Sequence, residues 1–193
     1  MKRFVIFLLA LFATANSFGW GQKGHDIVAY IAECNLTPKA YRKVVGVLDG
    51  HSPVYYANWL DGASHTPEYA YTKSWHYANV DEGNTYHTQP RNEKGDVVQA
   101  VTAIVTKLKS GKLSPEEENI NLRMLIHLVG DMHCPMHAGR LSDRGGNGMK
   151  VKWFGQNTNL HSVWDSKIVA SARNWSYSEW VENLDRTSKE YKK

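Results

Sequence analysis

The sequence predicts a mainly α-helical domain that also contains a small β-hairpin. Three observations favour this class: apolar residues recur at helical spacing, strong helix-start signals precede two of these stretches, and no series of alternating strands is present. A chain of 193 residues, 42% hydrophobic and 22% charged, is long enough for one domain with its own core. We therefore expect a compact bundle of several helices.

The first half of the chain is expected to be helical, with one ambiguous segment. Thr37-Pro38 supplies a capping residue and a first-turn proline, and Asp49-Gly50 marks a helix end. The elements expected here are helices at 24–33, 39–48 and 54–64, and a segment at 68–76 that is helical or irregular.

The second half has the clearest signals. Residues 96–109 place valine, isoleucine and leucine on one stripe, which predicts an amphipathic helix. Ser114-Pro115 followed by two glutamates begins a helix that runs to about Met132 and stops before Pro135. The other elements expected are a polar loop at 81–94, a loop at 144–148, a hairpin strand at 149–154, and helices at 160–170 and 179–191.

The N-terminus has the pattern of a secretory signal, with the alternative of a short membrane anchor. Lys2 and Arg3 precede an apolar run, 4–15, that is too short to span a bilayer. Cleavage is plausible after Ala15 or after Gly19. We expect residues 1–19 to be a signal peptide, residues 20–193 to form one domain, and the protein to be secreted or periplasmic without a stable membrane anchor.

Charge and cysteine content exclude little. The first 19 residues carry two basic and no acidic side chains, so the net charge of +4 falls to +2 without them, too weak to indicate nucleic-acid binding by bulk electrostatics. Cys34 and Cys134 are the two cysteines, and in an oxidising compartment they could form one bridge. Cys134 also lies among histidines and aspartates, but these suffice as metal ligands without it.

Two His-x-x-x-Asp pairs carry the most specific chemistry. His127 and Asp131, like His161 and Asp165, are four residues apart, so each pair shares one helix face; His137 lies between the pairs. An isolated pair of this kind is more often a surface ion pair. Apolar residues surround Asp131, however, and a buried acid is costly unless it is paired or binds a metal. Imidazole and carboxylate suit zinc, which predicts metal-assisted hydrolysis of a phosphate ester.

The remaining histidines are less informative one by one. His76 and Asp61, each taken alone, would more often be buried structural residues than ligands. His25 follows a short segment with two glycines, which lets the backbone fold tightly. The histidines interpreted as surface or supporting residues are His51, His65, His87 and His133.

Six blocks taken together resemble the trinuclear-zinc, single-strand-specific nucleases secreted by fungi and plants, which also have bacterial relatives. They occur in order over residues 20–165 and are specific as a set. The blocks are Trp20-Gly-Gln-Lys-Gly-His25, Trp59-Leu-Asp61, Trp75-His76-Tyr77, His127 to His137, Gly145-Gly-Asn-Gly148 and Asn159-Leu-His161-Ser-Val-Trp-Asp165. The resemblance implies the mainly α zinc phospholipase C/nuclease fold, with three zinc ions in a cleft.

The resemblance also implies a ligand set. One zinc would be held by Asp61, His76, His127 and Asp131, a second by His137, His161 and Asp165, and a third by the amine and carbonyl of Trp20 with His25 and the bridging Asp131. Cleavage after Gly19 is the choice that frees the Trp20 amine to bind metal.

The activity implied is cleavage of single-stranded DNA and RNA to 5′-nucleotides, together with removal of 3′-phosphates from 3′-nucleotides, by a monomer. Asp131 and Asp61 would be catalytic, and Tyr77, Asn79 and Asn147 would bind the nucleotide. This chain has Asn79 where the family has aspartate. It also has Ser64 where members often carry lysine or arginine, so a stabilising charge would come from elsewhere, such as Lys73.

Two alternatives stay open. A zinc phospholipase C shares an N-terminal tryptophan and a similar ligand set, but it has a longer gap before its first histidine and a glutamate in place of Asp165. A non-catalytic zinc-binding relative is the other, since only 28 residues follow Asp165 and family members usually continue through further helices. We therefore expect a fragment or a shortened form.

Overall fold

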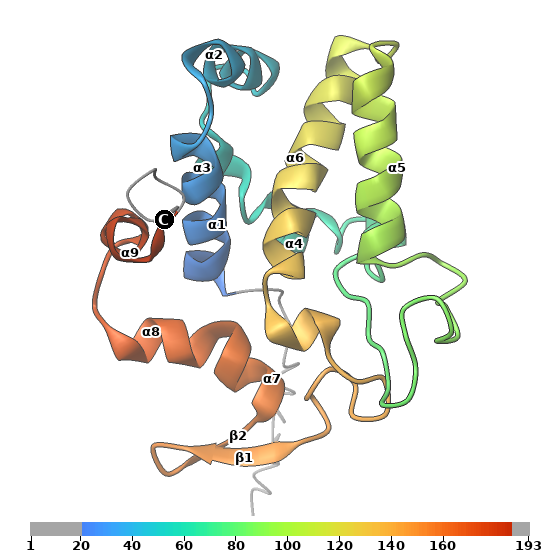
Figure 1. Ribbon diagram of the computed structural model, residues 1–193, viewed down its shortest axis with the longest axis vertical. Coiled ribbons are helices and arrows are strands. Elements are labelled where there is room, and N and C mark those ends of the chain that lie inside the picture. Colours follow the sequence, from blue (N-terminus) through green and yellow to red (C-terminus); the bar gives the residue numbers. More distant parts are fainter. Residues whose placement is uncertain (1–20, 187–193) are drawn as a thin grey trace, which may run out of the picture.

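The computed structural model describes residues 21–186, so the expected signal peptide, Trp20 and residues 187–193 lie outside the described part. The predicted fold class is confirmed: the described chain is mainly helical, with one two-stranded antiparallel sheet (Figure 1). In chain order the elements are α1 (Gln22–Cys34), α2 (Pro38–Val47), α3 (Pro53–Tyr56), α4 (Trp59–Ala63), η1 (Ala70–Thr72), α5 (Val97–Ser110), α6 (Pro115–Met132), η2 (Pro135–Ala138), β1 (Lys150–Trp153), β2 (Gln156–Asn159), α7 (Leu160–Ser162), η3 (Val163–Lys167), α8 (Ile168–Ala172) and α9 (Tyr177–Leu184).

Helix α6 begins and ends where the sequence predicts. The Ser114 hydroxyl accepts a hydrogen bond from Glu117 N (3.2 Å), and the Glu117 carboxylate accepts one from Ser114 N (2.8 Å), so a capping box satisfies both donors. Three glutamates in the first turn also complement the positive end of the helix dipole. The helix has 18 residues, and Pro135 follows soon after its end. This element carries His127 and Asp131.

The apolar core lies between α4, α5 and α6. Helix α5 starts with Asp96 accepting a hydrogen bond from Gln99 N (2.9 Å) and ends at Ser110; Gly111 caps this end with a φ of 64°, which suits glycine. It runs beside α6 (Figure 1). The buried side chains of this core are Leu60, Ala63, Val97, Ala100, Ile104, Met124 and Leu128. These contacts hold the C-terminal half of α6 in place.

The predicted single helix at 54–64 is wrong, because the chain breaks into α3 and α4. The carbonyl of Ala57 accepts a hydrogen bond from His127 Nδ1 (2.8 Å), and the Asn58 amide donates to Asp26 Oδ1 (2.8 Å). These contacts with other elements compete with the helical ladder at the junction. Residues 68–76 contain the single 3₁₀ turn η1 and are otherwise irregular.

The hairpin leads directly into the last site-bearing segment. Strands β1 and β2 pair antiparallel, with Lys150 opposite Asn159 and Trp153 opposite Gln156. The helix expected at 160–170 is present, but its middle is the π-helical segment η3. A π segment widens the helix, and such segments are frequent at functional sites. Asp165 lies within it.

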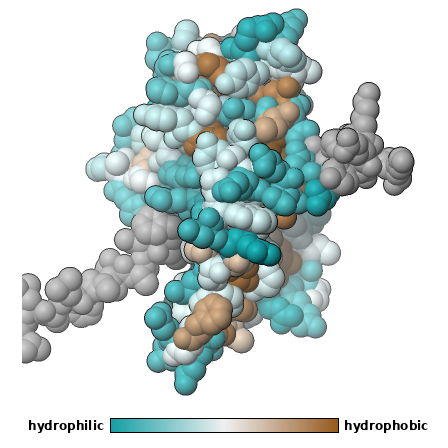
Figure 2. All heavy atoms as spheres, turned by 90° about the vertical axis from the view of Figure 1, so that its left-hand side faces the viewer, coloured by the Kyte–Doolittle hydropathy of each residue, from teal (hydrophilic) through white to brown (hydrophobic). Residues whose placement is uncertain are grey.

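Helix α1, which carries His25, makes the main contacts of the N-terminal part of the described chain. Helix α1 packs against α3, α6 and α9 (Figure 1). Helix α9 begins two residues earlier than expected and ends at Leu184. The face seen in Figure 2 is mainly hydrophilic, with hydrophobic residues scattered over it. No helix among the described residues is long and apolar enough to cross a membrane.

Candidate metal centre

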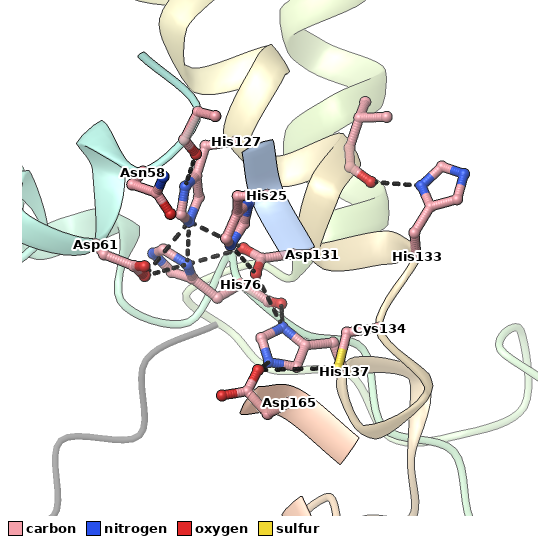
Figure 3. Close-up of polar contacts among 12 residues, drawn as sticks. His25, Asn58, Asp61, His76, His127, Asp131, His133, Cys134, His137 and Asp165 are labelled. Carbon is pink, nitrogen blue, oxygen red and sulfur yellow. Dashed lines mark hydrogen bonds and ion pairs between the residues drawn. The ribbon is translucent and has the colours of Figure 1, made fainter. Parts of the chain in front are cut away.

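Asp131 is a fully buried carboxylate surrounded by imidazoles. Its Oδ1 lies 3.5 Å from His25 Nε2 and 3.1 Å from His137 Nδ1, and its Oδ2 lies 2.9 Å from His76 Nδ1 and 3.3 Å from His127 Nε2. His127 and Asp131 are one turn apart on α6, and both are 0% exposed. As predicted, their spacing puts both side chains on one face of the helix. Figure 3 shows the other histidines converging on this face from three further segments.

The first donor group consists of Asp61, His76 and His127. Asp61 Oδ1 lies 3.4 Å from His127 Nε2, and His76 Nδ1 lies 3.1 Å from the same nitrogen. One ligand atom from each residue lies within 4.8 Å of the others. When two donor atoms bind one zinc at about 2.0–2.1 Å each, the distance between the two donors is similar to the distances found here. This group therefore has the dimensions of a cation site.

The second donor group consists of His25, His127 and Asp131. His25 comes from α1, is 1% exposed, and stacks on His127 with ring centroids 4.1 Å apart. Neither ring nitrogen of His25 makes a hydrogen bond within the described part of the chain. A buried imidazole without such a partner fits a metal ligand, because burial of an unsatisfied polar group is otherwise costly.

The third donor group consists of Cys134, His137 and Asp165. Asp165 Oδ1 lies 3.8 Å from His137 Nε2 and 3.9 Å from Cys134 Sγ. The ring of His161 stacks beside His137, with centroids 5.2 Å apart. All four side chains are buried, and they come from η2 and its preceding residue, α7 and η3.

Three histidines of the site are oriented by main-chain carbonyls. In each case Nδ1 lies at hydrogen-bond distance from a carbonyl, which only accepts, so Nδ1 carries the proton and Nε2 is left as the donor for a metal. The pairs are His127 with Ala57 (2.8 Å), His137 with His76 (2.7 Å) and His161 with Gly145 (2.8 Å). Main-chain atoms from three loops therefore set the direction of these rings.

Gly145 is required by its backbone and by its surroundings. Its φ is 60°, which disfavours a side chain, and a Cβ would come 2.6 Å from the Met136 carbonyl oxygen. This close approach brings the 144–148 loop against η2. It explains the glycine at the start of the Gly145-Gly-Asn-Gly148 block in physical terms.

Burial and neighbouring charges shift the pKa values of several side chains in the site. Burial acts against ionisation of both Asp131 and His127, but their mutual attraction and hydrogen bonds outweigh it: the pKa of Asp131 is held well below its ordinary value, and the pKa of His127 is raised to about 10. Burial lowers the pKa of His25 and raises the pKa of Asp165 to about 7. Burial also raises the pKa of the Cys134 thiol to about 12. A bound cation would take the place of the protons held here.

A cleft of about 440 Å³ opens onto the donor groups. Asp61, His76, His137 and His161 line it, so four of the donors face the cleft while the others lie behind them. The residues expected to bind a nucleotide lie in its wall, as does Lys73, which was expected to supply a stabilising charge. The wall includes Tyr77, Asn79 and Asn147, together with Ser64, His65, Lys73, Met136, Leu141 and Arg144.

Most of the predicted ligand residues converge. The structure brings together His25, Asp61, His76, His127, Asp131, His137, His161 and Asp165. Trp20, the other predicted ligand, lies outside the described residues. His133 points away on the far side of α6, as expected, and bonds to the Val129 carbonyl (2.7 Å; Figure 3). His51, His65 and His87 are exposed, as expected, although His65 borders the cleft.

The structure bears on both roles considered for the cysteines, a disulfide bridge and a metal ligand. Cys34 and Cys134 are not bridged: Cys34 is exposed and Cys134 is buried. The sequence favours histidines and aspartates over Cys134 as ligands, yet the Cys134 sulfur lies within the third donor group. Its position directly before Pro135 gave no signal of this contact.

Comparisons with known proteins agree with the site. A model of the family described as S1/P1 Nuclease matches residues 20–193. Endonuclease 2 of Arabidopsis thaliana is 29% identical over 194 residues, covering 93% of this chain and 66% of its own length. Nuclease P1 of Penicillium citrinum is 30% identical, covering 86% and 65%, and Nuclease S1 of Aspergillus oryzae is 28% identical, covering 89% and 62%.

The matched relatives are longer than this chain. The chain spans between 58% and 66% of the length of the curated relatives it matches. The family match nevertheless extends over both the helical core and all three donor groups. On this basis, the chain belongs to the S1/P1 nuclease family.

Proposed function

We propose that this protein is a zinc-dependent phosphodiesterase that hydrolyses single-stranded DNA and RNA to 5′-nucleotides and removes phosphate from 3′-nucleotides. The observation that carries the proposal is the convergence of three donor groups around Asp131 and His137, beside a cleft that Asp61, His76, His137 and His161 line. Membership of the S1/P1 nuclease family supports the choice of a nucleic-acid substrate.

The donor set supports three zinc ions. Asp61, His76, His127 and Asp131 would hold one ion, His137, His161 and Asp165 a second, and His25, Asp131 and the terminal amine of Trp20 a third. Nitrogen and carboxylate donors suit zinc, and buried ring nitrogens without hydrogen bonds on His25 and His137 fit this role. Bound zinc would supply water of lowered pKa and would neutralise charge that develops on the phosphate.

Two aspartates have different positions and therefore different roles. Asp131 is fully buried, contacts imidazoles through both oxygens, and would hold the donor groups in register. Asp61 lines the cleft, so its carboxylate would accept a hydrogen bond from the attacking water and orient it toward phosphorus. Lys73 and Arg144, also in the cleft wall, would attract the phosphate in place of the charge that is lacking at Ser64.

The cleft wall suits a base that is not paired. Tyr77 is 38% exposed, and its ring would offer a surface on which a base can stack. Asn79 and Asn147 each carry an amide that donates and accepts, so they would read the edge of the base. A base in a duplex cannot reach such a wall without unstacking, which favours single strands.

A paired assay tests this function. Purified protein would be analysed for zinc, and its hydrolysis of single-stranded DNA, duplex DNA, a 3′-nucleotide and phosphatidylcholine vesicles would be measured. We expect bound zinc and turnover of the single strand and the 3′-nucleotide, both lost in Asp131→Asn. Turnover of phosphatidylcholine alone would assign the phospholipase C alternative, and zinc without turnover of any substrate would assign the non-catalytic one.

Export and a monomeric state are also part of the proposal. The basic start at Lys2 and Arg3 and the apolar run after it support removal of residues 1–19 and secretion or delivery to the periplasm. N-terminal sequencing of exported protein should begin at Trp20. A first residue of Asn16, or an intact Met1, would contradict the proposed role of the Trp20 amine.

A further inference from the structure

The third donor group contains a sulfur atom that the ligand set above does not use. Cys134 is 0% exposed, and its Sγ lies 3.9 Å from Asp165 Oδ1. His137 Nε2 approaches the same oxygen at 3.8 Å. Figure 3 shows the sulfur and the His137 ring turned toward Asp165 from η2 and the residue before it. Three different donor types therefore surround one small volume.

A second observation points to a ligand in that volume. His137 is 4% exposed, and its Nε2 makes no hydrogen bond with any described residue, although its Nδ1 lies 2.7 Å from the His76 carbonyl. Since the proton is on Nδ1, Nε2 presents a lone pair to the same volume as the Cys134 sulfur. A buried lone pair is costly unless it meets a proton or a cation.

The backbone around Cys134 holds the sulfur in this direction. Cys134 N donates to the Asp131 carbonyl (2.9 Å), and the Cys134 carbonyl accepts from His137 N (3.0 Å). Pro135 follows and restricts the backbone of Cys134 to an extended conformation, seen as φ −84° and ψ 121°. The turn from Asp131 to His137 therefore sets both the imidazole and the sulfur. The thiol is not in a disulfide.

We propose that Cys134 is a thiolate ligand of the divalent cation held by His137 and Asp165. This inference rests on the proposed metal-dependent function and adds a donor to it. When the cation binds, a metal–sulfur bond forms, the S–H bond breaks, the proton passes to solvent, and no atom changes oxidation state. A set of thiolate, imidazole and carboxylate favours zinc, cobalt and cadmium over magnesium, calcium and manganese.

Cobalt substitution of the purified chain tests the assignment directly. Cobalt(II) bound to a thiolate gives a sulfur-to-metal charge-transfer band in the near ultraviolet, which nitrogen and oxygen ligands do not give. We expect this band in the wild-type protein and its loss in Cys134→Ser. The affinity of Cys134→Ser for zinc at this position should fall by about 10-fold or more, since changes beyond the ligands themselves already cost 10–100-fold.

Cys34→Ser is the matched control, because Cys34 is exposed and lies in α1. This variant keeps a single cysteine, so a band that persists in it must come from Cys134, and the assignment survives even if Cys134→Ser does not fold. Elemental analysis of each sample separates the two claims. Bound cobalt without the band would overturn the thiolate ligand but leave the metal-dependent function intact, whereas a protein that binds no metal would overturn both.

Discussion

His25 in α1 packs against Gly130 in α6 so closely that position 130 has no room for a side chain. A Cβ there would collide with His25 Nδ1 and come 3.1 Å from its Cε1. The glycine thus lets an imidazole from the start of the chain lie over the helix that carries His127 and Asp131. The stacking of His25 on His127, with ring planes 15° apart, follows from this approach.

Gly130→Ala should therefore destabilise the fold and displace His25. Overpacking of this kind costs about 1–3 kcal/mol. Zinc content should fall, because the second donor group would lose His25. Chemical denaturation and elemental analysis measure the two effects. Gly46→Ala in α2 is the matched control: nothing lies within 4 Å of its Cβ position, so it should stabilise by about 0.4–1 kcal/mol. Equal stability of the two variants would contradict a close contact between His25 and position 130.

Removal of metal should lower the melting temperature. A ligand present at about 100 times its Kd stabilises the folded state by about 2.7 kcal/mol, which corresponds to roughly 5–10 °C for a chain of this size. Differential scanning fluorimetry with and without a chelator gives this shift, and added zinc should restore the midpoint while magnesium should not. An unchanged midpoint after complete chelation would count against structural zinc.

Zinc binding to protein stripped of metal should release protons at pH 7. The pKa of His127 is raised to about 10, so this imidazole is protonated at pH 7. Asp165, with a pKa of about 7, is partly protonated at the same pH. Coordination needs both groups deprotonated, so apparent affinity should rise as pH increases from 6 to 8. Calorimetric titration in two buffers of different ionisation enthalpy counts the protons. Identical heats in both buffers would show that none are released.

Tyr77→Ala should weaken substrate binding more than it slows the chemical step. Stacking of one base on an aromatic ring contributes about 1–3 kcal/mol, so kcat/KM for single-stranded DNA should fall about 5- to 150-fold, mainly through KM. Tyr77→Phe should retain most activity. Tyr55→Ala removes a tyrosine that is 65% exposed and stacks on His51 outside the cleft, so it should behave like the parent protein.

Local signals predicted the helices that begin and end for local reasons. Helix α6 has its capping box, first-turn proline and terminal proline within the sequence itself, and its two ligand candidates follow from a spacing of four. The break between α3 and α4 had no such signal, because it depends on the Ala57 carbonyl meeting His127, 70 residues away. Helix propensity describes the preference of one segment alone, whereas here a distant side chain determines where the helix breaks.

The same reasoning explains which site residues were predicted. His127, Asp131 and His137 stand close in the chain, and a resemblance to known blocks identified Asp61, His76 and His25. Cys134 was underestimated because its contact with Asp165 joins two segments 31 residues apart, through a π-helical turn that has no simple sequence pattern. Tertiary placement of a single sulfur atom cannot be read from spacing.

The carbonyl oxygens of Ala57, His76 and Gly145 steer three imidazoles. Every amino acid brings the same peptide oxygen, so exchange of the side chain at position 57 cannot delete that acceptor as it would a supporting carboxylate. The direction of the His127 ring therefore depends on where the loop at position 57 lies rather than on which side chain stands there, and an insertion or deletion that shifts the loop would disturb it.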